Sequence, residues 1–459
     1  MGIFGALNTA VSGLRAQSYA LENISGNIAN ASTTGYKRTE TSFADLVLGG
    51  DVSARRQTSG SVMSFSRSTN DLQGNLTGST SATSLGINGP GYLLVQKATG
   101  SSDGSPLFGA GTNYTRRGDF DVDRNGYLYN GAGYYLMANR LDPATGSPVG
   151  SSPEVVQISK DPYPAVATST ITYRGNLPAT PKTANYVAGD ESSWLLDSSL
   201  GSEITADQSA AFIASSVSGD SLTVYDATGT AQDVQFRWGK VSNADTAAGT
   251  GDTWALFYQS NSAATGSEVA WTQVDADPAA AGAQAYAFEG GALTTPAGGS
   301  TTVPSLVING VDLGSVSIDH GSALTQYADA TGLVSTKQVS QNGSAAGDYV
   351  GVEVSDGGTI TATYSNGKTR ALYSIPLATF VAENQLKHLD GGAYAATAAS
   401  GSAVLGSGSA IVGMAVEESN VDIADEFTKL IVTQQAYSAN TRVVSTSDSM
   451  MQEALSMLR

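Results

Sequence analysis

Few residue patterns in this sequence could support binding or catalytic chemistry. The run Asp121-Val-Asp123-Arg-Asn125-Gly126 has the acidic spacing that opens a calcium-binding loop. The twelfth position of such a loop requires a bidentate Glu, and here it is Ala132. Asn-Gly between alternating apolar residues is instead a strong hairpin signal. We therefore predict a β-turn at this position and no metal site.

Two further short motifs resemble binding loops. Gly367-Lys368-Thr369 matches the end of a phosphate-binding loop, but the position that needs the first glycine is Ala362, and the flanks read as strands. The tripeptide Arg117–Asp119 reads Arg-Gly-Asp, which is an adhesion motif in other settings, and it precedes an expected strand. We predict neither a nucleotide site nor a receptor-binding loop.

Catalytic combinations of side chains are not evident elsewhere. His320 and His388 are the two histidines, and neither has an obvious nucleophile or ligand companion in the sequence. The chain has no Cys, which excludes disulfides, thiolate catalysis and thiolate-bound metals. Glu417-Glu418 precedes an expected helix, where negative charge favours the helix N-terminus. We predict that the protein is not an enzyme and has no cofactor, metal or catalytic site.

The overall charge and hydropathy exclude other classes of protein. Lys and Arg number 23 against 41 Asp and Glu, so the formal net charge is −18 and nucleic-acid binding is disfavoured. No apolar run approaches the roughly 20 residues that cross a bilayer, so we expect no membrane insertion. The first 20 residues lack a basic leading segment and a long apolar core, so we expect no cleaved secretory signal.

The two ends of the chain share a seven-residue periodicity that indicates helices. Such spacing places apolar side chains on one stripe of an α-helix and favours a coiled-coil seam over a globular core helix. We expect the first helix to stop near Thr34-Gly35, and Asn420-Val421-Asp422 to cap the second. The predicted polymerisation interface consists of Leu7, Leu14, Leu21, Ile28, Phe427, Leu430, Tyr437, Val444, Met451 and Leu458.

Between the ends the pattern is that of β-structure. Gly91–Gln96 reads as a strand that follows a glycine turn, and Phe120–Tyr129 alternates around Asn125-Gly126. Two other hairpins are predicted around Asn366-Gly367 and around Ala227-Thr228-Gly229. Gly291–Thr302, rich in Ala, Gly and Thr, reads as a loop or hairpin connection. The predicted fold class is a mainly β, multidomain body with α-helical coiled-coil termini.

Both end segments resemble the axial proteins of the bacterial flagellum, which form the rod, the hook and the hook-associated junction. The matching motifs at the ends are Ala10-Val-Ser12-Gly13-Leu14-Arg-Ala16, Asn27-Ile28-Ala29-Asn30-Ala31-Ser-Thr33-Thr34-Gly35-Tyr36-Lys37, Glu418-Ser419-Asn420-Val421-Asp422-Ile423-Ala424-Asp425-Glu426-Phe427-Thr428 and Gln434-Gln435-Ala436-Tyr437-Ser438-Ala439-Asn440-Thr441-Arg442-Val443. In the middle, 86–92 and 114–120 resemble the β domain that rod and hook subunits share. Segments 225–229, 364–369, 377–380 and 394–397 resemble the hook subunit more specifically.

This resemblance implies a nested arrangement of discontinuous domains. We expect an inner helical domain from residues 1–30 and 417–459, and a linker segment at 31–70. An inner β domain is expected from 71–170 and 345–416, with an outer β domain inserted at 171–344.

The resemblance also implies a function and a location. The expected function is that of a structural subunit that self-assembles into the curved, flexible hook, which joins rod to filament and transmits torque. Expected partners are further copies of the chain, the rod and hook–filament junction proteins, the hook cap during assembly and the flagellar export apparatus. The expected location is the flagellum at the cell exterior, reached without signal cleavage.

Two alternatives remain from the sequence. One is a distal-rod or hook-associated junction subunit. Against it, 459 residues exceed typical rod subunits and leave room for an outer domain, and the C-terminal motif of junction proteins usually lacks the Ser-Asn-Val-Asp run found here at 419–422. A secreted β-rich adhesin or carbohydrate-binding module is the alternative of another class. It requires exposed aromatic platforms and ends that do not polymerise.

Overall fold

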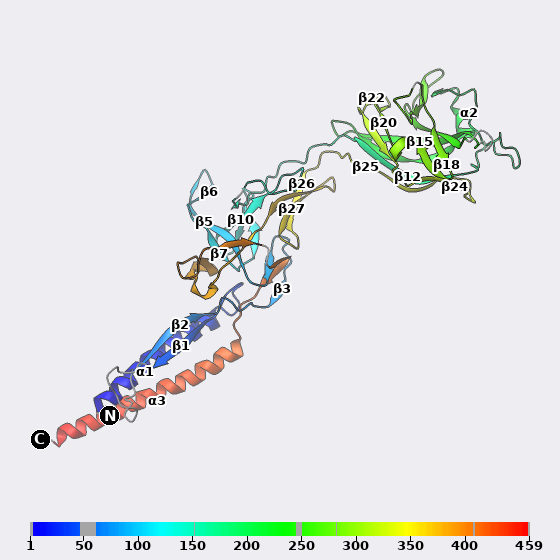
Figure 1. Ribbon diagram of the computed structural model, residues 1–459. Helices are drawn as coiled ribbons and strands as arrows, with labels where there is room; N and C mark the ends of the chain where they lie inside the picture. The colour runs from blue at the N-terminus through cyan, green and yellow to red at the C-terminus, as the bar shows by residue number, and fades with distance from the viewer. Residues whose placement is uncertain are drawn as a thin grey trace. The chain divides into compact units, whose positions relative to one another are not determined.

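The computed structural model describes residues 3–45, 61–150, 152–244, 250–280, 282–406 and 409–457. The chain forms two compact units, the first from Met1–Asp161, Tyr349–Thr363 and Lys368–Arg459, and the second from Pro162–Asp348 and Tyr364–Gly367. The structure is mainly β, with one long helix near each end of the chain (Figure 1). The predicted fold class is therefore confirmed.

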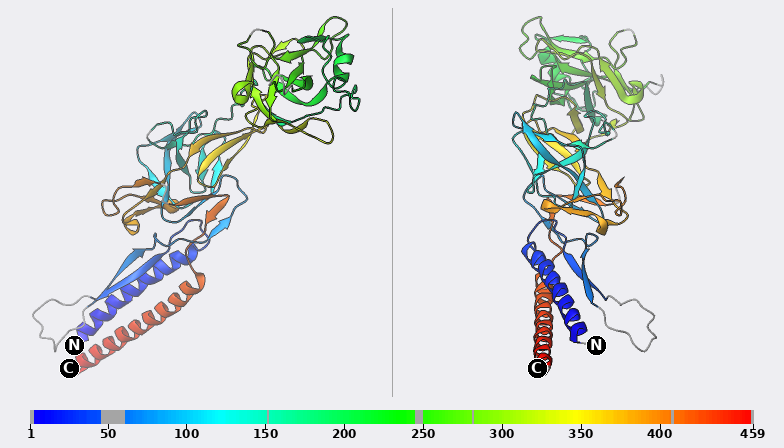
Figure 2. Two further views of the ribbon diagram at one scale, coloured as in Figure 1. Left: turned by 45° about the vertical axis from the view of Figure 1, so that its right-hand side comes forward. Right: turned by 90° about the vertical axis from the view of Figure 1, so that its left-hand side faces the viewer.

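The two long helices, α1 (Ile3–Ala29) and α3 (Ile423–Ser456), pack side by side in the first unit (Figure 2). They run in opposite directions, so the N- and C-terminal ends of the chain lie at the same end of the pair. α1 ends at Ala29, before the predicted stop at Thr34-Gly35. At this end the Gly26 carbonyl oxygen accepts both the Asn30 backbone N–H at 3.2 Å and the Asn30 side-chain amide at 2.9 Å.

A β-hairpin lies along α1 in the segment that was expected to be a linker. Its strands are β1 (Thr39–Asp45) and β2 (Val62–Ser68), paired antiparallel with Thr41 opposite Ser66. Tyr19 on α1 bonds Ser66 at 2.6 Å between oxygens, and Asn23 donates to the Thr41 hydroxyl at 2.8 Å. These polar contacts hold one face of the hairpin against the helix.

The β body of the first unit is built around one large, mostly antiparallel sheet and two short strand pairs. Its buried core includes Leu93, Val95, Phe120, Leu136 and Ile360. The strands of the sheet are β5 (Tyr92–Ser102), β6 (Ser105–Phe108), β7 (Asn113–Thr115), β8 (Phe120–Val122), β9 (Leu128–Asn130), β10 (Tyr134–Arg140), β11 (Glu154–Val155), β26 (Tyr349–Val354), β27 (Thr359–Tyr364), β28 (Thr369–Ser374), β29 (Leu377–Thr379), β30 (Lys387–Leu389), β31 (Ala393–Ala395) and β32 (Val404–Gly406). The short pairs are β3 (Leu76–Gly78) with β34 (Ala415–Glu417) and β4 (Leu85–Asn88) with β33 (Ala410–Gly413).

The second unit has its own sheet and its own core. Val234, Phe236 and Trp238 alternate with less buried residues along one strand, as a sheet with a buried face requires. The strands of the sheet are β12 (Thr170–Pro178), β13 (Glu203–Thr205), β14 (Val217–Tyr225), β15 (Ala231–Ser242), β16 (Asp252–Gln259), β17 (Val269–Val274), β18 (Tyr286–Glu289), β19 (Ala292–Thr295), β20 (Ser300–Val303), β23 (Val316–Asp319), β24 (Leu324–Tyr327) and β25 (Ser335–Gln341). A separate pair, β21 (Val307–Ile308) with β22 (Val311–Asp312), and the short helix α2 (Ser209–Ala214) complete the unit.

The three predicted hairpins are confirmed as β8–β9, β27–β28 and β14–β15. In the first, the Asp123 carboxylate accepts the backbone N–H groups of Asn125 and Tyr127, each at 2.8 Å. Gly126 has φ +85°, and a Cβ there would lie 2.2 Å from the carbonyl oxygen of Ile158. The acidic run at 121–126 thus shapes a turn, as the sequence predicts.

Candidate assembly surface on the terminal helices

The interface between α1 and α3 is made of small and polar side chains. On α1 the buried positions include Ala16, Ala20 and Ile24, and on α3 they are Glu426, Thr433 and Ser447. A Cβ on Gly13 would lie 3.0 Å from the side-chain nitrogen of Asn440, so the helices approach closely there. Contact within one chain therefore leaves Phe4 and most large apolar side chains of α3 exposed.

Nine of the ten predicted polymerisation residues lie in the described parts of this helix pair, in different degrees of burial. Phe427 and Tyr437 are 50% and 40% exposed. Leu458 lies outside the described residues. The half-buried members are Leu7, Leu14, Leu21, Ile28, Leu430, Val444 and Met451.

α3 carries a second apolar row that the sequence analysis did not identify. Val432, Val443, Met450 and Met457 are all more than two-fifths exposed, and the last three recur every seven residues. Each residue advances about 100° around a helix, so Val443 lies on a different side from its neighbour Val444. The seven-residue spacing of Val443, Met450 and Met457 could have revealed this row in the sequence. It was missed because each of these residues directly precedes a member of the predicted row that includes Leu430 and Val444.

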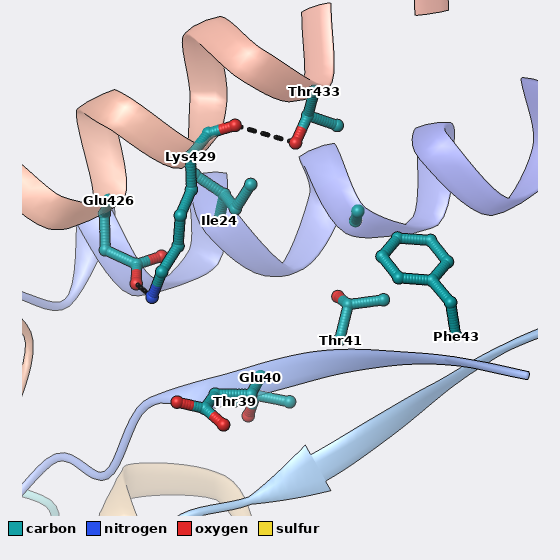
Figure 3. A pocket seen from close by; sticks show the side chains of 9 residues that line it. Ile24, Thr39, Glu40, Thr41, Phe43, Glu426, Lys429 and Thr433 are labelled. Atoms are coloured by element: carbon teal, nitrogen blue, oxygen red, sulfur yellow. Dashed lines mark hydrogen bonds and ion pairs between the residues drawn. The ribbon is translucent and has the colours of Figure 1, made fainter. Parts of the chain in front are cut away.

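A groove opens between β1 and α3 near the base of the helix pair, which is the end that adjoins the β body. Its volume is about 350 Å³. Ala20 and Ile24 of α1, Phe43 of β1, and Lys429 and Thr433 of α3 all line it (Figure 3). The Phe43 ring is 46% exposed, so an apolar wall of the groove faces solvent.

A buried ion cluster fixes the base of the helices to the β body. Lys37 Nζ lies 2.5 Å from Glu417 Oε1, and Arg116 Nη1 lies 3.2 Å from Glu417 Oε2. The Gly74 backbone N–H donates to the same carboxylate at 2.8 Å. Burial lowers the pKa of Lys37, an effect that the Glu417 carboxylate opposes. Residues far apart in the sequence are thus joined at one charged point.

The polar motif residues at the ends surround this cluster. Asn27 donates to Glu426 at 3.0 Å and to the carbonyl of Thr39 at 2.9 Å. Asn420 accepts the Arg38 backbone N–H at 2.7 Å. From the sequence, Asn27 stands out only within a family motif, and Asn420 within such a motif and as part of the expected helix cap. In the structure their amides bond backbone groups where the chain leaves the helices.

The start of α3 confirms one expectation and corrects another. The Asp422 carboxylate accepts the N–H groups of Ala424 and Asp425 at 2.8 and 3.2 Å, as expected for an N-cap. Glu417 was expected to favour the helix N-terminus by its charge. Its carboxylate instead turns inward to Lys37 and Arg116, because two buried cations there need a counter-charge.

The residues that suggested chemistry have structural partners. Arg117 Nε bonds Asp119 at 2.8 Å, so the two charged side chains of the Arg-Gly-Asp tripeptide pair with each other. His320 is buried with its ring nitrogens 2.9 Å from the Tyr173 carbonyl oxygen and 3.2 Å from the Tyr286 hydroxyl, and burial lowers its pKa to about 4. His388 lies 3.2 Å from the Ser68 hydroxyl, and burial lowers its pKa as well.

The described part of the chain contains neither a cluster of metal ligands nor a membrane-spanning helix. Among the described residues, acidic, His and Cys side chains do not gather in threes as a metal site needs. None of the helices in the described ranges has the length and hydropathy to cross a membrane.

Three family models match the chain. They are a flagella basal body rod protein model at residues 7–37, the flagellar hook protein FlgE/F/G D1 domain at 86–177, and the flagellar basal body rod FlgEFG protein C-terminal model at 413–457. The flagellar hook protein FlgE of Brucella suis biovar 1 (strain 1330) is 31% identical over 467 aligned positions, which cover 100% of both chains. The chain belongs to the flagellar hook protein family. It is a structural subunit of the bacterial flagellar hook.

Other members of the hook family align over nearly the whole chain. FlgE of Rhizobium meliloti (strain 1021) is 30% identical with 100% of both chains covered. FlgE of Salmonella typhimurium is 28% identical, covering 96% of this chain and 97% of its own. A crystal structure of Helicobacter pylori hook protein FlgE2 overlaps with a TM-score of 0.49 and 12% identity, over 73% of this chain and 99% of that one. The resemblance to a hook subunit predicted from the sequence is confirmed.

Proposed function

We propose that this hook-family chain polymerises with copies of itself through its terminal helices, forming a curved and flexible tube that joins rod to filament and transmits torque. The observation that supports this most strongly is the exposure of large apolar side chains on α3. They are Ile423, Phe427, Ile431, Val432, Tyr437, Val443, Met450, Leu455 and Met457. Burial of one such side chain contributes roughly 1.5–3 kcal/mol. A few of them in contact with neighbours are enough to order helices that are marginal alone.

The proposal assigns a role to each part of the chain. Residues 1–30 and 417–459 form the polymerising domain, and they fold fully as copies assemble. Residues 31–70 connect it to an inner β domain at 71–170 and 345–416. The outer domain at 171–344 sets the preferred curvature through sliding contacts between neighbours. Gly-rich turns and separate cores suit rigid bodies joined by compliant connections.

The remaining partners follow from membership in the hook family. The chain meets the rod at one end of the polymer and junction proteins at the other, with a cap at the growing end. A chain with no Cys forms no disulfides, so it passes unfolded through an export channel without a covalent obstacle. We assign no enzymatic activity to it.

Electron microscopy of concentrated purified protein tests this function. We expect tubes from the full chain, and a folded but non-polymerising body after removal of residues 1–30 and 420–459. Tyr437→Asp places a charge on the exposed apolar surface and should raise the critical concentration at least tenfold, because an unpaired charge is costly to bury. Ser438→Asp on the same helix is the matched control and should have little effect. Monomers of the full chain under all conditions would contradict the proposal.

A further inference from the structure

A cavity of about 610 Å³ in the first unit gathers positive charge on a chain that is strongly negative overall. It lies where β10, β11 and β28 meet the turn between β8 and β9. Three basic side chains, those of Arg124, Arg140 and Lys160, line it and are exposed to solvent. Among the described residues that line it, Glu154 is the one acid. The local balance is therefore three positive charges against one negative, or +2, whereas the whole chain carries −18.

The three basic side chains have no acidic partner of their own. In the described part of the chain the ion pairs are formed by other cations, so no carboxylate oxygen lies within 4.0 Å of a side-chain nitrogen of Arg124, Arg140 or Lys160. Lys160 Nζ donates to the Arg124 carbonyl oxygen at 3.2 Å, and Arg124 Nη2 donates to that of Gly104 at 3.4 Å. Both acceptors are neutral. Like charges gathered in a cavity without compensation attract an anion.

Hydrogen bonds fix the walls of the cavity. The Asn125 amide donates to the Gly104 carbonyl oxygen at 2.8 Å, and the Gln157 amide donates to the Asn125 carbonyl oxygen at 3.3 Å. The Tyr373 hydroxyl donates to the carbonyl oxygen of Gln157 at 3.0 Å. The turn that carries Arg124 is therefore joined both to the neighbouring turn between β5 and β6 and to the segment after β11. A ligand that enters finds the backbone already in place, which lowers the entropic cost of binding.

The cavity also has an apolar part. Val155, Ile158 and Tyr373 line it, and Ile158 and Tyr373 are buried. Small-molecule sites commonly combine an apolar surface, which holds the body of the ligand, with a few charged groups that fix its orientation. They occupy roughly 300–1,000 Å³, a range that includes this cavity. The lining therefore suits a ligand that has both an anionic group and a body.

We propose that this cavity binds a phosphate-bearing small molecule, whose phosphate contacts Arg124, Arg140 and Lys160. A phosphate monoester carries a charge of about −1.5 to −2 at neutral pH, which matches the +2 of the lining better than the single charge of a carboxylate does. The planar guanidinium groups match phosphate oxygens in pairs, and Lys160 adds a point charge. The phosphate belongs to a soluble sugar phosphate or to a lipid headgroup, which the test distinguishes. This binding adds to the proposed function and does not depend on it.

Isothermal titration calorimetry of the full chain with glucose 6-phosphate tests the site. At low ionic strength we expect saturable binding that weakens as salt is added, because salt screens the charges. Arg140→Gln and Lys160→Gln should each raise the Kd about tenfold, the effect of losing one charge-assisted hydrogen bond. Glu154→Gln removes the one negative charge of the lining and should lower the Kd. A general disturbance of the fold by substitution would not produce these opposite effects.

A control variant and a second probe complete the test. Lys387 is an exposed cation on β30 that does not line the cavity, so Lys387→Gln should leave the Kd unchanged. Flotation with vesicles of phosphatidic acid in phosphatidylcholine replaces the sugar phosphate in the second arm. Binding that Arg140→Gln weakens and Lys387→Gln does not supports the site, and the arm in which it occurs identifies the source of the phosphate. No binding in either arm, or an equal loss in Lys387→Gln, overturns the proposal.

Discussion

Loss of the Glu417 charge should destabilise the first unit strongly. Glu417 and Lys37 have fully buried side chains, and Arg116 is 3% exposed. Glu417→Gln keeps the size of the side chain but leaves two buried cations without their carboxylate. Removal of one partner from a buried ion pair typically costs about 3–5 kcal/mol. We expect a loss in the free energy of unfolding of at least about 3 kcal/mol.

Hydrogen exchange measured by mass spectrometry resolves this effect by region. At about 1.4 kcal/mol per tenfold change, peptides containing Gly35 and Gly74 should exchange more than 100-fold faster in the variant. Their backbone N–H groups bond to Glu417 in the native chain, at 2.7 Å for Gly35 and 2.8 Å for Gly74. Peptides from the second unit should not change, and tryptophan fluorescence checks this because all four Trp lie there.

A matched surface variant supplies the control. Glu40 pairs with Arg38 at 2.9 Å, but its side chain is 34% exposed, so Glu40→Gln should cost no more than about 1 kcal/mol. Equal and small effects of Glu40→Gln and Glu417→Gln would refute the reasoning that burial gives the cluster its importance.

Two other predictions concern single side chains. Asp422→Ala removes the N-cap of α3 and should reduce stability by about 1 kcal/mol, seen as lower helical circular dichroism of the full chain on heating; no change would contradict the capping role. His320 has a native pKa of about 4 and an unfolded value near 6.5, so below pH 6.5 the unfolded state binds a proton that the native state does not. The free energy of unfolding of the second unit should therefore fall by roughly 2–3 kcal/mol between pH 7 and pH 4.5, measured by tryptophan fluorescence in denaturant. His320→Gln should lack this part of the loss, and an identical pH profile in both proteins would refute the assignment.

The sequence predicts those elements whose signals are local. Heptad spacing indicated both long helices, and Asn-Gly or Thr-Gly turns indicated three hairpins. The strand β19 and most of β20 lie within Gly291–Thr302, a segment that the sequence predicted to be a loop or hairpin connection. Ala and Gly are depleted in strands, and here pairing with strands further along the chain decides the structure.

The candidate assembly surface was predicted in part. Spacing alone locates an apolar row but does not tell which side of a helix faces its own chain. The side of α3 that meets α1 is occupied by Glu426, Thr433 and Ser447, which are polar and carried no apolar signal. The groove was not predictable because Phe43 and Thr433 are almost 400 positions apart in sequence.

The hydrogen bonds that join residues 35–37 to residues 417–420 have a mechanical consequence. The Gly35 N–H bonds the Glu417 carbonyl oxygen at 2.7 Å, and the Asn420 N–H bonds that of Tyr36 at 3.2 Å. Both covalent connections between the helix pair and the β body therefore run through one cross-linked point. A pull on either helix is divided between two chain segments, so no single segment bears the whole load. The two connecting segments are joined to each other by backbone hydrogen bonds and by the buried Lys37–Glu417 ion pair. A linked pair of segments resists twisting of the helices against the body better than two unlinked segments of the same length.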